Sequence, residues 1–138
     1  SEGIASTRKG QFGVNAINNI TNDRRKKIII WGDSFVESHQ VNDEDKIPQV
    51  ITKKLVEINT NSHINSSIMS FGVGMSGDSV ADYYFDIPEY EALTQPVEAH
   101  FIIITNINDI LPDQSSDTKR GLFKSNPFRI YQDQWQPF

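Results

Sequence analysis

Short apolar runs alternate with amphipathic stretches along the middle of this chain. Three runs rich in β-branched and aromatic residues are bounded by glycine or polar residues, which is typical of buried parallel strands. Between them, apolar residues recur at helical spacing, first around Pro48 and again after Ser79. The predicted strands cover residues 27–31, 66–71 and 100–105. The predicted helices cover about 47–58, with Asp45 as cap, and about 80–87, where Pro88 is expected to end or redirect the helix.

The order strand, helix, strand, helix, strand predicts an α/β fold with a parallel sheet. A chain of 138 residues has room for one domain. We divide it into an irregular lead-in (1–26), a βαβαβ core (27–110) and a segment without strand signals (111–138). This last segment is rich in Gln, Ser, Asp and Pro, and we interpret it as a loop or cap.

Charge and composition exclude several classes of function. The net charge is −5, and residues 61–118 contain nine acidic residues without any Lys or Arg. Only residues 24–27 form a basic cluster, and they lead directly into a predicted strand, so we expect no nucleic-acid interface. No apolar run approaches the ~20 residues of a membrane span, so no span is expected. Cysteine is absent, which excludes disulfides, thiolate metal sites and a cysteine nucleophile.

The candidate chemistry follows the ends of the predicted strands. The first strand leads into Gly32-Asp33-Ser34, the second into Gly72, and the third into a segment containing Asn108. The carboxyl ends of parallel strands meet at one edge of a sheet, so these residues are expected to converge there. A serine hydroxyl with a glycine N–H and an asparagine amide would supply a nucleophile and an oxyanion hole. Glycine and asparagine also end strands for purely structural reasons, so spacing alone does not decide between the two interpretations.

Three segments together resemble the signature blocks of the SGNH (GDSL-type) hydrolase superfamily. Residues 28–35 (IIIWGDSF) resemble the first block, residues 71–73 (FGV) the second, and residues 108–109 (ND) the third. Residues 41–45 (VNDED), which precede an amphipathic helix, also resemble a loop found in one subgroup of these enzymes. The resemblance covers roughly residues 10–112.

The resemblance implies a three-layer α/β/α sandwich of flavodoxin-like type, and ester hydrolysis without a metal or organic cofactor. Ser34 would be the nucleophile. The backbone N–H groups of Ser34 and Gly72 and the side chain of Asn108 would stabilise the oxyanion, with Gly74 as second choice for the glycine. Asp33 and Asp109 are expected to hold the loops after their strands.

The family's C-terminal Asp-x-x-His block, which supplies the general base, does not occur in this chain. Of the histidines present, His63 and His100 are expected at the amino ends of strands, away from the site. His39, five residues after Ser34, is the one that could approach it. The family sheet has about five strands, so the fold is expected to be incomplete at its C-terminus, with later units beyond Phe138. The alternative is a complete chain that lacks the base.

The leading hypothesis is a serine ester hydrolase whose substrate is a small-molecule or glycan ester, with an O-acetylated sugar preferred. The subgroup resemblance also favours an extracytoplasmic location. A binding or scaffolding module on the same fold, and a polysaccharide O-acyltransferase, are the alternatives.

Overall fold

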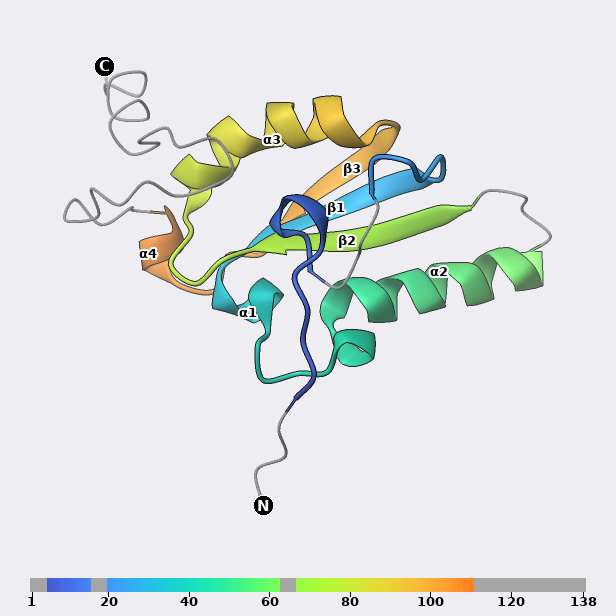
Figure 1. The fold of residues 1–138 in the computed structure, drawn as a ribbon, viewed down its shortest axis with the longest axis horizontal. Helices are drawn as coiled ribbons and strands as arrows, with labels where there is room; N and C mark the ends of the chain where they lie inside the picture. Colours follow the sequence, from blue (N-terminus) through green and yellow to red (C-terminus); the bar gives the residue numbers. More distant parts are fainter. Residues whose placement is uncertain (1–4, 16–19, 63–66, 111–138) are drawn as a thin grey trace.

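The computed structural model describes residues 5–15, 20–62 and 67–110, and they form a parallel sheet with helices on both sides (Figure 1). The strands are β1 (Lys26–Gly32), β2 (Ile68–Gly74) and β3 (Val97–Ile102). The α-helices are α1 (Ser34–Glu37), α2 (Ile47–Ser62), α3 (Val80–Thr94) and α4 (Ile107–Ile110). Two 3-10 helices, η1 (Gln11–Gly13) and η2 (Asp43–Asp45), precede β1 and α2 respectively. The predicted loop or cap at 111–138 and His63 lie outside the described residues.

The three strands are parallel, in the order β2-β1-β3, with β1 in the centre. Gly32 at the end of β1 pairs with Gly74 at the end of β2, and Trp31 pairs with Ile102 at the end of β3. All three strands therefore end at the same edge of the sheet, beside α1 and α4 (Figure 1). The prediction of an α/β fold with a parallel sheet is confirmed, and the arrangement is consistent with a flavodoxin-like fold.

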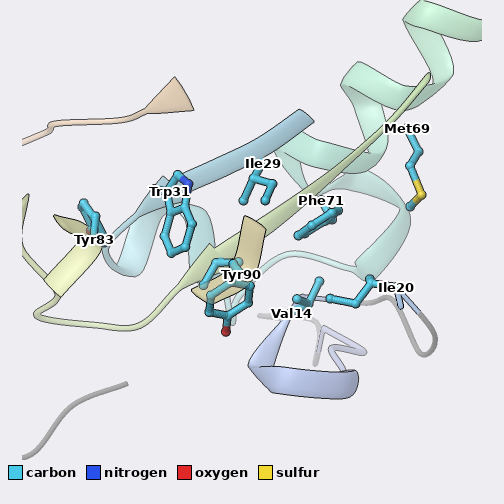
Figure 2. Close-up of a cluster of buried hydrophobic side chains, with 9 residues drawn as sticks. Val14, Ile20, Ile29, Trp31, Met69, Phe71, Tyr83 and Tyr90 are labelled. Carbon is cyan, nitrogen blue, oxygen red and sulfur yellow. The ribbon is translucent and has the colours of Figure 1, made fainter. Parts of the chain in front are cut away.

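One face of the sheet carries the apolar core. Trp31 and Phe71 are fully buried on this face, and the rings of Tyr83 and Tyr90 of α3 lie against Trp31 (Figure 2). The Tyr90 ring meets the Trp31 ring edge-on at 5.2 Å between centroids, a favourable geometry for an aromatic pair. Further core residues come from the strands and from the lead-in: Val14, Ile20, Ile29, Met69 and Val73. The irregular lead-in thus contributes to the core of this fold.

The opposite face of the sheet packs against α1 and α2. A Cβ on Gly72 would lie 2.9 Å from Cγ of Pro48 and 3.0 Å from Cγ1 of Val36, so only glycine allows these helices to come this close. Ser70, two residues earlier, is buried and hydrogen-bonds through its N–H to Thr52 Oγ1 on α2 at 2.8 Å. Helices on both faces of the sheet give the three layers that the sequence predicts (Figure 1).

The predicted ends of two strands are wrong. β2 continues through Gly72 to Gly74, because the glycines leave room for α1 and α2 and do not interrupt the pairing with β1. β3 begins three residues earlier than predicted, at Val97, and ends at Ile102. His100 therefore lies inside β3, paired with Ile29, and not at the start of the strand.

Two predicted helix boundaries are also wrong. Pro88 does not end α3, which continues to Thr94. The residue is exposed, so its ring lies toward solvent and does not disturb the buried side of the helix. Asp45 does not cap α2, because it belongs to η2, and Lys46 separates it from the first residue of the helix.

The basic cluster at the start of β1 is divided between solvent and protein. Lys27 is fully buried, and its ammonium group donates hydrogen bonds to the backbone carbonyls of Arg25 at 3.1 Å and Gln95 at 3.3 Å. Arg25 pairs with Asp23. Lys26 pairs with Glu98 across the sheet. Three of the four basic residues therefore have partners inside this chain.

Candidate functional site

The loops that follow β1 and β3 meet at the carboxyl edge of the sheet. The Ile103 N–H donates to the Trp31 carbonyl at 2.8 Å, which extends the pairing beyond the last residue of β3. Thr105 Oγ1 then lies 3.4 Å from Asp33 Oδ2. The structure thus brings the third-strand loop beside the Gly32-Asp33-Ser34 turn.

Ser34 is the first residue of α1, directly after the central strand, and it is exposed. Asp33 caps the helix, because its side chain accepts the Phe35 N–H at 3.0 Å and its carbonyl accepts those of Val36 and Glu37. Asp33 is thus the loop-holding residue that the sequence indicates. The N–H of Ser34 lies one residue before these three N–H groups. It has no acceptor among the described residues and is available to a ligand.

The two candidate glycines differ in their surroundings. Gly72 lies two residues inside β2, packed under α1 and α2, and its carbonyl accepts the Asn15 N–H at 2.9 Å. Gly74 lies at the strand end, where a Cβ would be 2.7 Å from the Gly32 carbonyl oxygen and 3.0 Å from that of Asp33. Gly74, the second choice from the sequence, is the glycine that touches the turn before Ser34.

Asn108 lies in α4, and its side chain is outside the described part of the chain. The adjacent Asp109 is buried and accepts hydrogen bonds from the N–H groups of Thr105 at 2.7 Å and Asn106 at 2.9 Å. Burial alone would raise the pKa of Asp109, but these hydrogen bonds outweigh it and hold the pKa below its usual value. Asp109 therefore fixes the loop that leads into α4, as the sequence indicates.

Glu37, at the end of α1, connects the site to two distant segments. Its side chain is 7% exposed and accepts the N–H and hydroxyl of Ser76 at 2.8 Å each. Lys9 of the lead-in lies 3.0 Å away and also donates to the Gly74 carbonyl at 2.9 Å. Burial acts to raise the pKa of Glu37, but Lys9 and Ser76 lower it to about 2. Glu37 thus holds the end of β2 against α1, and sequence spacing gives no sign of this role.

The two described histidines are engaged away from Ser34. His39 Nε2 lies 2.9 Å from Glu37 Oε1, and its side chain is 59% exposed. His100 Nδ1 accepts a hydrogen bond from Trp31 Nε1 at 3.0 Å, so His100 has a structural role. Among the described residues, no histidine hydrogen-bonds to the Ser34 hydroxyl.

This edge of the sheet is acidic. Burial raises the pKa of Tyr83, and the nearby carboxylates of Asp78, Asp33 and Asp109 raise it further. These three carboxylates come from three different segments of the chain, and Asp82 of α3 itself acts in the same direction. Their combined potential disfavours a strongly anionic ligand here.

Within the described ranges, no group of three or more His, Asp or Glu side chains is arranged to hold a metal ion. None of the helices in these ranges is both long and apolar enough to cross a membrane.

No protein-family model matches this chain, and searches of curated proteins and of solved structures find no significant match. The resemblance to SGNH hydrolases therefore depends on the chain's own residues.

Proposed function

We propose that this chain is a serine ester hydrolase of the SGNH type, with Ser34 as its nucleophile. The observation that carries the proposal is the position of Ser34. It is exposed, it directly follows the central strand, and the ends of both neighbouring strands lie at the same edge of the sheet. Ligands bind at this edge in open parallel sheets.

In the proposed reaction, Ser34 Oγ attacks the ester carbonyl carbon and forms a tetrahedral intermediate. The oxyanion accepts hydrogen bonds from the Ser34 N–H and from two further donors, for which the sequence proposes the Asn108 amide and the N–H of Gly72, with Gly74 as second choice; of the two glycines, Gly74 touches the Ser34 turn. Collapse of the intermediate expels the alcohol and leaves an acyl-serine, which water then hydrolyses. In the acyltransferase alternative, a second alcohol replaces this water.

The proton of Ser34 needs an acceptor, since serine is a weak nucleophile at neutral pH. His39 and His100 are held by Glu37 and Trp31, so neither is assigned this role. The proposal therefore assigns the general base to neither of the described histidines.

An uncharged ester such as an O-acetylated sugar is the preferred substrate class. The carboxylates of Asp33, Asp78 and Asp109 at this edge disfavour anionic esters. Tyr84 of α3 is 47% exposed and Phe35 next to Ser34 is 61% exposed, so both rings are accessible to the apolar face of a sugar.

The test is hydrolysis of p-nitrophenyl acetate, whose good leaving group tolerates weak activation of the serine. We expect Ser34→Ala to lower the rate at least tenfold, whereas Ser67→Ala, an exposed serine before β2, leaves it unchanged. Equal rates for the parent chain and Ser34→Ala would refute the assignment of Ser34.

A binding module on the same fold is the second candidate, and the engagement of both described histidines away from Ser34 favours it. This candidate predicts that the parent chain and Ser34→Ala both lack turnover. It also predicts that they bind a glycan ester equally well.

A further inference from the structure

A small cavity lies beside the candidate active site, between the lead-in, the end of β2 and α3. It has a volume of about 190 Å³, and its lining includes Phe12, Met75, Asp78, Asp86 and Tyr90. Gly74 also lines it, so the cavity adjoins the strand end that touches the Ser34 turn. Pockets for drug-sized ligands measure roughly 300–1,000 Å³, so this one suits a single head group.

Two polar groups of the cavity already have partners within the protein. The Lys9 ammonium group is 3.0 Å from Glu37 Oε1 and donates to the Gly74 carbonyl at 2.9 Å. The Tyr90 hydroxyl donates to the Phe12 carbonyl. Among the described residues, the Asp86 carboxyl has no hydrogen-bond or ion-pair partner, so it is available to a ligand, and Asp78 adds a second carboxyl group to the lining.

The remaining lining is apolar and partly aromatic. Phe12, Tyr90, Met75 and Val73 line the same cavity as Asp86. A carboxylate next to aromatic and thioether side chains suits an organic cation, because the carboxylate supplies the charge and the rings attract cations through their faces. A hydrated metal ion would gain little from apolar walls.

We propose that this cavity is a binding site for a small organic ammonium group, with Asp86 as its counter-ion and Phe12 and Tyr90 as its walls. The site does not depend on hydrolysis by Ser34, and it would also exist in a catalytically inactive binding module.

The proposed site gives binding a dependence on pH. Burial raises the pKa of Asp86 to about 7, and the nearby charges of Asp82 and Glu89 on the same helix contribute. The charged groups that line the cavity from other segments are Lys9, which is paired with Glu37, and Asp78. A cation prefers the ionised carboxylate, so its binding releases a proton near neutral pH. Affinity should rise about tenfold between about pH 6 and about pH 8, as Asp86 becomes ionised.

The test is a calorimetric titration of the full 138-residue chain with tetramethylammonium, with tert-butanol as an uncharged comparison of similar shape. We expect saturable binding of the cation that is at least tenfold tighter than that of the alcohol and strengthens with pH. Asp86→Asn should weaken it at least tenfold. Glu91→Gln, an exposed change of equal charge on the same helix, should weaken it less than twofold.

Three results would overturn the proposal: no saturable binding, equal binding of tert-butanol, or equal weakening by the two substitutions. The comparison of cation with alcohol and the pH series use the parent chain, so they decide the matter even if Asp86→Asn does not fold. None of these measurements depends on ester hydrolysis.

Discussion

Glu37 is the side chain at which three segments of this molecule meet. It lies at the end of α1 and binds Lys9 of the lead-in, His39 of the following loop and Ser76 of the loop after β2. Because Lys9 also binds the Gly74 carbonyl, this group of contacts joins the end of β2 to the helix that begins with Ser34. Glu37 is therefore a positioning residue for the candidate site.

Replacing Glu37 with Gln should destabilise the fold by about 2–3 kcal/mol at pH 7, because the buried ion pair with Lys9 is lost and Lys9 is left without its counter-ion. The pKa of Glu37 is about 2 in the folded chain against 4.5 for an unperturbed glutamate, so its contribution is complete above about pH 4.5 and lost as the pH falls toward 2. Urea unfolding of both proteins across this range measures the effect.

The matched control for this prediction is Glu57→Gln, which breaks the exposed Lys54–Glu57 pair. It should cost less than about 0.5 kcal/mol at any pH. The role of Glu37 would be refuted if the two substitutions lowered the free energy of unfolding equally. It would also be refuted if the difference in this free energy between the parent chain and Glu37→Gln stayed the same at low pH.

At the scale of single residues, the sequence predicts those residues whose roles depend on local chain geometry. Asp33 and Asp109 hold the loops after their strands, as expected, because each accepts N–H groups within four residues. Glu37 could not be found in this way, because its partners Lys9 and Ser76 are 28 and 39 residues away along the chain.

At the scale of elements, the apolar pattern predicts which elements exist better than where they end. β2 passes through Gly72 because tertiary packing against Pro48 and Val36 requires glycine there, whereas the sequence alone suggests a turn. α3 passes Pro88 because its buried residues on either side, among them Tyr83 and Tyr90, continue to pack on the sheet. Packing between elements thus overrides local signals at both positions.

The strands differ in how well the described residues cover them. Phe71 of β2 is fully buried, whereas Phe101 of β3 is 57% exposed. Phe71→Ala should therefore cost about 3–5 kcal/mol and Phe101→Ala less than about 1 kcal/mol. Chemical denaturation of both variants measures this difference. A cost for Phe101→Ala as large as that for Phe71→Ala would show that this face of β3 is covered by something outside the described residues.

At the scale of the whole molecule, topology and charge act together on the candidate site. The order β2-β1-β3 makes the strand that precedes Ser34 the central one, so the loops of both neighbours flank it. The acidic stretch recognised in the sequence contributes Asp78 and Asp109 to this edge. The sequence therefore predicts the class of fold, the edge at which the candidate residues meet and the sign of the charge at that edge. It does not predict the cavity beside Gly74, which forms only when the lead-in packs against α3.

The central claim is that Ser34 is a nucleophile, and covalent labelling with a fluorophosphonate probe tests it most directly. The reagent is applied to the full chain, and mass spectrometry identifies the modified residue. We predict one label per chain, located on Ser34, absent from Ser34→Ala and retained in Ser67→Ala. A chain that takes up no label, or one that keeps its label in Ser34→Ala, would contradict the claim.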